Sequence, residues 1–321
     1  MKKITLTFLL LITALFTYAQ LSEDFSSGVP PTGWSIDAHS ANWSVYNGAV
    51  GAGTAPKARF NWQPRFTGTS RLISPQINLT GALSAVVISF DHFYDYYGGA
   101  YTYGVATRSG GGAWNTVWTA TNVDVTETRS IAITNGDVGQ ADFQFCFFMT
   151  GDTYNINDII IDNVNVTIPS ISDVELLPLT MVPYASAGNV DINSTFKNLG
   201  LTAVTSIDVN YQIDGGTVVT ETLTGLNVAL TQAYNHTFAT PWVATSGDYN
   251  VNVWVSNVNG GGADGTPGND MRSMDMSIAT QSTQNVPLYE EFTSSTCGPC
   301  AGFNTNSFND AFLAANVGTI V

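Results

Sequence analysis

Short runs of apolar residues, several alternating with polar residues, recur between residues 21 and 280 and are separated by Gly, Asn, Asp and Pro. Apolar residues at every second position lie on one face of an extended strand, whereas the separating residues favour turns. Long helical periodicity is missing from this part of the sequence. The chain is therefore predicted to be mainly β, and with only three cysteines it must be held together by packing.

The first β domain is predicted to span residues 20–169 and to be a jelly-roll sandwich of two sheets. Its strands are expected at 86–90, 101–106, 143–148 and 159–161. Cys146 lies in one of the most apolar of these runs, so it is interpreted as a buried and unreactive thiol.

The two ends of this domain carry its most specific pattern, which comprises Glu23-Asp24-Phe25, Pro30-Pro31-Thr32-Gly33-Trp34 and Ile159–Val164. The pattern resembles the cleaved-adhesin and choice-of-anchor J domains, relatives of the MAM jelly rolls found on bacterial surface proteins. The resemblance implies that the first and last strands are neighbours. It also implies a structural calcium ion at Glu23, Asp24 and Asp162, with ordinary strand-end carboxylates as the alternative.

An aromatic segment, Phe-Asp-His-Phe-Tyr-Asp-Tyr-Tyr-Gly-Gly at residues 90–99, is expected to lie between two strands. Aromatic faces beside carboxylates suit sugar rings, which stack on the ring face and hydrogen-bond through their hydroxyls. Tyr94, Tyr96 and Tyr97 are therefore candidate glycan-binding residues. The alternative is that these aromatic side chains fill the core of the sandwich.

The second β domain is predicted to span residues 170–280, with alternating runs at 190–196, 207–213 and 249–255 and a tight turn at Asp214-Gly215-Gly216. About seven strands in a segment of this length fit an immunoglobulin-like sandwich. The phrases Lys197-Asn198-Leu199-Gly200 and Tyr211–Gly215 resemble the cell-adhesion-related CARDB-type modules, which implies a spacer domain. Residues 260–270 are predicted to form a flexible loop, with a calcium-binding loop as the alternative.

Near the end of the sequence, Cys297-Gly298-Pro299-Cys300 follows a short apolar run and precedes a segment with helical spacing. Two thiols at this spacing can close into a disulfide, and a helix start stabilises the thiolate of the first cysteine. Cys297 is the candidate nucleophile and Cys300 the candidate resolving thiol. A purely structural disulfide is one alternative. Zinc is another, but it needs two more ligands, and the remaining cysteine and the histidines are scattered through the chain, at Cys146, His39, His92 and His236.

The dithiol and the preceding Glu290-Glu291-Phe292-Thr293 resemble the active-site region of thioredoxin-fold proteins, most closely the outer-membrane-protein-28-related family of envelope proteins. The resemblance implies thiol–disulfide exchange with envelope or surface proteins, without a cofactor, in which Glu291 helps to move the proton of the resolving thiol. Gly298 and Pro299 complete the motif. Residues 281–321 are too few for a thioredoxin fold, so we expect them to be the N-terminal part of a truncated domain that belongs to a longer protein, with a relic of such a domain as the alternative.

The first 19 residues contain Lys2 and Lys3, an apolar core at 6–16 and Ala19, a pattern typical of a secretory signal peptide. The apolar core is too short to favour a membrane span, so no transmembrane segment is expected after cleavage. The protein is therefore expected to be exported to the periplasm, the outer membrane or the cell surface.

The charge balance, ten Lys and Arg against 25 Asp and Glu, gives a formal net charge of -15. Such a surface repels phosphate backbones, which argues against nucleic-acid binding and fits calcium or a neutral glycan better. Two functional hypotheses follow. The protein is either a thiol–disulfide oxidoreductase of the envelope, or a non-catalytic adhesin or scaffold that binds glycan or protein through its β domains.

Overall fold

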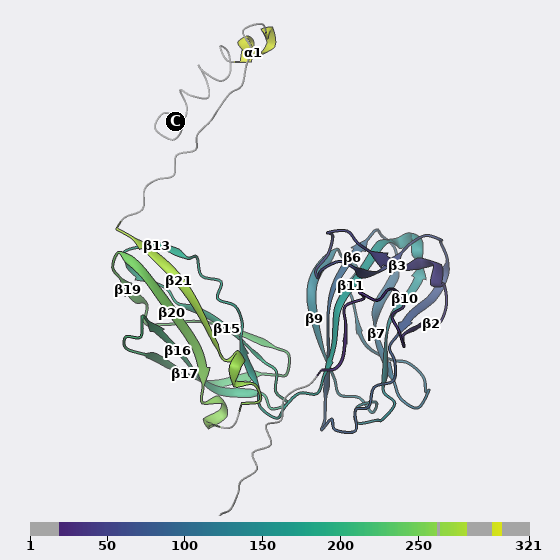
Figure 1. Cartoon of the computed structure of the whole chain (residues 1–321), viewed down its shortest axis with the longest axis horizontal. Helices are drawn as coiled ribbons and strands as arrows, with labels where there is room; N and C mark the ends of the chain where they lie inside the picture. The colour runs from purple at the N-terminus through teal and green to yellow at the C-terminus, as the bar shows by residue number, and fades with distance from the viewer. Residues whose placement is uncertain (1–18, 262–263, 281–296, 304–321) are drawn as a thin grey trace, which may run out of the picture. The chain divides into compact units, whose positions relative to one another are not determined.

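The computed structural model describes residues 19–261, 264–280 and 297–303 (Figure 1). These residues are mainly β, as predicted. Apart from Ala19, the predicted signal peptide lies outside the described residues, as do Glu291 and most of the predicted thioredoxin-like segment.

Eleven strands and two 3-10 helices lie between residues 19 and 167: β1 (Ala19–Glu23), β2 (Ser35–Ile36), η1 (Ser40–Asn42), β3 (Trp43–Tyr46), β4 (Lys57–Asn61), β5 (Thr67–Ile73), β6 (Val86–Tyr96), β7 (Tyr101–Arg108), β8 (Asn115–Thr119), β9 (Val125–Ile133), β10 (Gln144–Asp152), η2 (Thr153–Asn155) and β11 (Ile156–Thr167). The later elements are β12 (Val174–Leu176), β13 (Tyr184–Ser186), β14 (Gly188–Val190), β15 (Asn193–Asn198), β16 (Val204–Ile213), β17 (Val219–Val228), β18 (Ala233–Thr237), β19 (Trp242–Ala244), β20 (Gly247–Ser256), η3 (Val258–Gly260), η4 (Pro267–Asn269), β21 (Met271–Ala279) and α1 (Gly298–Phe303).

Strands β1 to β11 form two antiparallel sheets, which we call the first sandwich (Figure 1). One sheet has the order β3-β4-β11-β6-β9, with β1 also paired to β11, and the other has the order β2-β5-β10-β7-β8. The first and last strands are neighbours, as expected, since Glu23 pairs with Val164. β9 is an edge strand of one sheet and β8 is an edge strand of the other, and a pocket lies between these two strands.

A continuous apolar core joins the inner faces of the two sheets. Along β6 every second residue from Val86 to Tyr94 is buried, which places its apolar side chains on the inner face. Phe90 of this strand meets Phe147 of β10 edge to face, with ring centroids 4.9 Å apart. Because these side chains come from opposite sheets, their burial binds the two layers together.

The aromatic segment at residues 90–99 corrects one prediction, because most of it is not a connection between strands. β6 continues to Tyr96 and pairs with β11 on one side and β9 on the other. The alternation of buried and outward-facing side chains simply carries on through Tyr94, so this part of the segment contributes to the core.

Strands β12 to β21 pair only with one another among the described residues, in sheets ordered β12-β15-β18, β13-β21-β20-β16-β17 and β14-β19. The predicted tight turn after β16 is confirmed, since Gly216 N donates to Ile213 O and both Asp214 and Gly215 have positive φ. The predicted run at 190–196 is instead divided between β14 and β15.

The chain divides into two compact units. Residues 19–167, which form the first sandwich, all belong to one of them. Of the described residues, the other unit contains 182–190, 241–249, 275–280 and 297–303. Among the described residues, no helix has the length and apolar character needed to cross a membrane.

Candidate functional site

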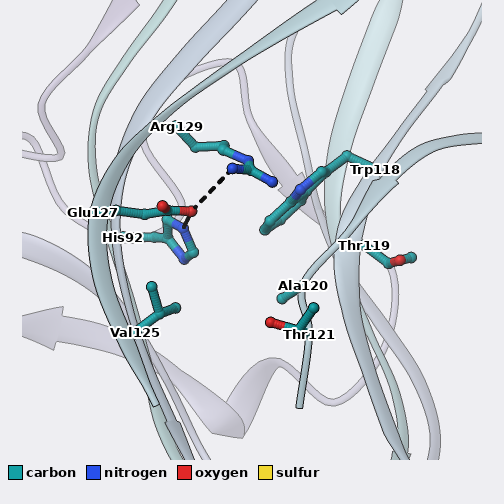
Figure 2. Close-up of a pocket in the computed structure, with 8 residues that line it drawn as sticks. All are labelled: His92, Trp118, Thr119, Ala120, Thr121, Val125, Glu127 and Arg129. Carbon is teal, nitrogen blue, oxygen red and sulfur yellow. Dashed lines mark hydrogen bonds and ion pairs between the residues drawn. The ribbon is translucent and has the colours of Figure 1, made fainter. Parts of the chain in front are cut away.

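A pocket of about 180 Å³ opens between the two edge strands of the first sandwich (Figure 2). One wall comes from β9 and from the neighbouring strand β6, and the opposite wall from β8 and the residues that follow it. The residues that line it are His92, Trp118, Thr119, Ala120, Thr121, Val125, Glu127 and Arg129. The pocket therefore forms where hydrogen bonding between strands ends in both sheets.

One face of β9 carries charged side chains in one part and apolar side chains in another, and the charged part forms the wall of the pocket. Ile131 and Ile133 of this face are buried in the core, whereas Glu127 and Arg129, which precede them on the same face, lie at the pocket with side chains 37% and 41% exposed. Charged side chains that point inward from an edge strand also discourage pairing with another sheet. The inner surface of the sandwich thus turns from apolar to hydrogen-bonding at this point.

His92 stands directly opposite Glu127 across the β6–β9 pairing, and its side chain is completely buried. Its Nε2 lies 3.2 Å from Glu127 Oε1, and the same carboxylate oxygen lies 3.4 Å from Arg129 Nη1. Burial lowers the pKa of His92, and the hydrogen bond with Glu127 only partly opposes this effect. His92 is accordingly neutral at neutral pH.

Trp118 forms the opposite wall of the pocket. An irregularity in β8 sets the direction of its side chain. The register of β7 against β8 shifts between Val105 and Ala106, and a bulge of this kind re-aims the side chains of an edge strand. Gly104 permits the approach, because a Cβ there would collide with the Trp118 carbonyl and the Phe148 ring. The Arg129 guanidinium lies 5.3 Å from the indole ring centre and covers one of its faces.

The pocket contains polar atoms whose hydrogen bonds are not satisfied. His92 Nδ1 and Trp118 Nε1 belong to side chains that line the pocket, are buried and have no hydrogen-bond partner within the described part of the chain. In Figure 2 the Thr121 hydroxyl turns toward the interior of the pocket, whereas the Thr119 hydroxyl turns away. An unpartnered buried polar atom costs free energy, so a ligand with hydroxyl groups would find hydrogen-bonding capacity already in place.

The tyrosines predicted to bind glycan do not share one surface. Tyr94 is fully buried, and its hydroxyl donates to Asn122 Oδ1 at 3.3 Å. Tyr96 is partly buried against the core, and Tyr97 is 61% exposed beyond the end of β6. Core packing therefore describes Tyr94, and only Tyr97 is open to solvent.

The carboxylates predicted to hold calcium are brought only partly together. Asp162 is 1% exposed; its Oδ2 accepts a hydrogen bond from Thr54 N, while Oδ1 has no partner in the region described. Burial and then repulsion from Asp24 and Asp162 raise the pKa of Glu23, against hydrogen bonds that lower it. Asp24 is exposed and accepts a hydrogen bond from Ser26 N. Among the described residues, no group of three or more His, Cys, Asp or Glu side chains could hold a metal ion.

The two cysteines of the dithiol motif form a disulfide, with Cα atoms 5.3 Å apart. Cys300 N donates to Cys297 Sγ at 3.3 Å, and the intervening Gly298 and Pro299 are exposed. Helix α1 begins at Gly298, inside the motif. Glu291, predicted to assist proton transfer, lies outside the described residues.

The comparisons with known proteins concern the fold. No family model and no curated protein matches the sequence. The CARDB domain of a Pyrococcus furiosus protein, solved in complex with di-metal ions, is 20% identical over 34% of this chain and 94% of that chain, with a TM-score of 0.29. Family 16 Carbohydrate Binding Module-2 is 14% identical over 46% and 99%, with a TM-score of 0.33. The CBM22-1 xylan-binding domain of Paenibacillus barcinonensis Xyn10C is 14% identical over 48% and 96%, with a TM-score of 0.32.

These neighbours are a CARDB domain and two carbohydrate-binding modules. At such identities the likeness concerns the fold alone. Any argument about function has to come from the residues of the pocket.

Sequence reasoning missed Trp118, Glu127 and Arg129. The two charged residues are separated by one position on a strand, which is a common exposed pattern, and Trp118 lies in a run with no distinguishing motif. The one signal that could have indicated this site is the appearance of charge on a strand face whose next residues are Ile131 and Ile133.

Proposed function

We propose that this is an exported carbohydrate-binding protein whose first sandwich binds one sugar residue of a glycan in the pocket between β8 and β9. The observation that carries the proposal is the buried, unpartnered Nδ1 of His92, whose ring bonds to Glu127 through its other nitrogen and lines the same pocket as Trp118. Sugars supply hydroxyl groups that both donate and accept hydrogen bonds. The pocket offers both kinds of partner.

Hydrogen-bonding roles follow from the contacts. The Glu127 carboxylate accepts a hydrogen bond from His92 Nε2–H, which leaves Nδ1 of the neutral ring as an acceptor for a ligand hydroxyl. Arg129 and Trp118 Nε1 are donors, and the Thr121 hydroxyl can act either way. Removing any one of these partners leaves a polar group of the complex unpaired.

The charges and the size of the pocket favour a single neutral ring. Glu127 and Arg129 offset one another, and the strongly acidic chain disfavours polyanionic ligands. At about 180 Å³ the pocket is smaller than the roughly 300–1,000 Å³ typical of sites for larger small molecules. It suits a terminal or side-chain sugar residue of a longer glycan.

The test is isothermal titration calorimetry of the purified chain against a panel of neutral monosaccharides and short oligosaccharides. Trp118→Ala, which removes one wall of the pocket, and Glu127→Gln, which removes the carboxylate that orients the His92 ring, should each weaken binding about tenfold or more. Trp114→Ala is the matched control, since Arg108 lies over Trp114 at 4.3 Å in a similar pair outside the pocket. The proposal is overturned if no neutral sugar binds, or if both pocket variants bind as the native chain does.

Thiol–disulfide exchange is a second candidate, favoured by the closed Cys297–Cys300 disulfide with its exposed Gly298-Pro299 link. A dithiol partner would attack this bond, pass two electrons and two protons to the cysteine pair and close its own disulfide. Starting from the reduced pair, Cys297→Ser should abolish insulin reduction by the full-length protein, whereas Cys146→Ala should leave it unchanged. Equal activity of the native protein and Cys297→Ser would exclude this candidate.

A structural calcium ion is a third proposal, supported by the unpartnered Asp162 Oδ1 near Glu23. Glu23 and Asp162 would hold the ion, together with Asp24 if its side chain turned away from Ser26. Calcium should then raise the thermal unfolding temperature of the native chain and of the control Asp95→Asn, but not that of Asp162→Asn. An identical calcium response in all three proteins would rule out this site.

A further inference from the structure

Beyond the pocket, one end of the first sandwich carries an exposed aromatic cluster that we call the Tyr154 surface. It consists of Trp62 and Arg65 from the connection between β4 and β5, Tyr97 from the turn after β6, and Tyr154 from η2. Tyr97 is 61% exposed and Tyr154 is 48% exposed. We infer that the Tyr154 surface is a second carbohydrate contact, which binds the sugar rings of a neutral polysaccharide.

The rings are arranged around Tyr154. Its ring centre lies 6.2 Å from Trp62 and 5.5 Å from Tyr97, and both contacts are edge to face. The Arg65 guanidinium lies 5.0 Å from the same ring. In an edge-to-face pair the edge of one ring lies against one face of the other, so such a contact covers at most one face of each ring, and Tyr97, which is 61% exposed, keeps a face open to solvent.

The surface is held in place by polar contacts with the backbone beneath it. Tyr97 N and Gly98 N both donate to Asn155 O, at 3.0 and 3.1 Å, and Asp152 Oδ1 accepts from Tyr154 N at 3.0 Å. Asp152 also pairs with Arg65 through two hydrogen bonds. A ligand would therefore meet rings whose supporting backbone is already ordered, which reduces the entropy cost of binding.

The charges of the surface point to a neutral ligand. Hydrogen bonds from Arg65 and from Tyr154 N lower the pKa of Asp152 to about 2, so the Arg65–Asp152 pair stays ionised and balanced at neutral pH. The side-chain amide of Asn155, the neighbour of Tyr154 in the chain, donates to Ala100 O, and the amide of Asn157 donates to the Asp95 carboxylate. Aromatic faces with neutral amides nearby suit the C–H faces and hydroxyl groups of sugars.

The size of the surface favours a polysaccharide over a protein. A stable protein interface uses about 20–30 residues on each side, whereas the Tyr154 surface has four principal side chains. A polysaccharide presents the same sugar face many times along its length. Together with the pocket of the proposed function, a weak second contact of this kind raises overall retention through multivalency.

The inference rests on the proposed function only for the role of the pocket, so the two sites are tested separately. Affinity electrophoresis in gels that contain soluble xylan, hydroxyethylcellulose or barley β-glucan measures retention by polysaccharide, and calorimetry with short sugars reports on the pocket. In at least one polysaccharide, the double variant Tyr97→Ala/Tyr154→Ala should weaken retention roughly tenfold while leaving short-sugar binding unchanged. Tyr97→Phe should keep retention, because it keeps the ring.

Tyr184→Ala is the matched control, since Tyr184 is 72% exposed and lies outside the first sandwich. If no polysaccharide retards the native protein, or if Tyr97→Ala/Tyr154→Ala is retained like Tyr184→Ala, the inference is wrong. If short sugars do not bind but retention is lost in the double variant alone, the pocket proposal fails and the Tyr154 surface stands.

Discussion

His92 Nε2 lies 3.2 Å from Glu127 Oε1, while the other ring nitrogen of His92 is buried and meets no hydrogen-bonding atom of the described chain. This asymmetry fixes the chemistry of the neutral ring, because the proton is placed on the nitrogen that faces the carboxylate. Nδ1 is then a hydrogen-bond acceptor as long as the ring is neutral. In the proposed function, His92 would serve as an oriented hydrogen-bond acceptor for a ligand hydroxyl.

The first prediction concerns the pH dependence of sugar binding. Burial lowers the pKa of His92 below its ordinary value of 6.5, so protonation of Nδ1, which removes the acceptor, occurs only as the pH falls below that value. The association constant should therefore be constant above neutral pH and decrease in acid. Calorimetry between pH 4.5 and pH 8 would test this. His92→Asn should bind weakly without that acid-dependent loss, and a native protein whose binding strengthens in acid would contradict the assignment.

The second prediction concerns the core. Phe147 is fully buried and joins the two sheets through Phe90, so Phe147→Ala should reduce the free energy of unfolding by about 3–5 kcal/mol. Denaturant unfolding followed by tryptophan fluorescence is suitable, since the first sandwich contains Trp34, Trp43, Trp62, Trp114 and Trp118. Val123→Ala, at a position 56% exposed, should change stability by less than about 0.5 kcal/mol. Similar transitions for the two variants would show that this aromatic contact does not hold the sheets together.

The third prediction concerns an acidic cluster around η4. Burial, followed by repulsion from Asp264 and Asp173, raises the pKa of Asp270 to about 7. A raised carboxyl pKa in the folded state gives stability that is fully present below the unfolded pKa of 3.8 and is lost as the pH rises through about 7. Asp270→Asn should therefore be more stable than the native protein at pH 8 and nearly equal to it at pH 4. Urea midpoints measured at the two pH values check the sign, and a native protein favoured at pH 8 would refute it.

The fourth prediction concerns Cys146, which is fully buried beside Ile73 and Phe148. Burial raises the pKa of its thiol to about 12, so the reactive thiolate is almost absent at pH 8. Iodoacetamide should not modify the native protein and should add one group per chain in urea, where the Cys297–Cys300 disulfide stays closed without reductant. Rapid modification of Cys146 under native conditions, seen by mass spectrometry, would show that this part of the core opens.

Local patterns determined much of the fold. Alternation placed strands at 86–90, 101–106, 207–213 and 249–255, and the Asp-Gly-Gly sequence placed the turn after β16. These predictions worked because side-chain alternation and turn preferences act over a few neighbouring residues. The same locality explains why the end of β6 was misjudged, since the pairing partners of Tyr94 and Tyr96 lie far along the chain.

The sequence by itself determined that this protein is mainly β, that Cys146 is a core residue and that Cys297 and Cys300 can pair. Only the tertiary structure decided which side chains meet at the pocket, because His92 and Glu127 are 35 residues apart and become neighbours through the pairing of β6 with β9. Trp118 joins them because β8 ends the other sheet on the same side. Strand order is set by burial of the whole core, and no short stretch of sequence records it.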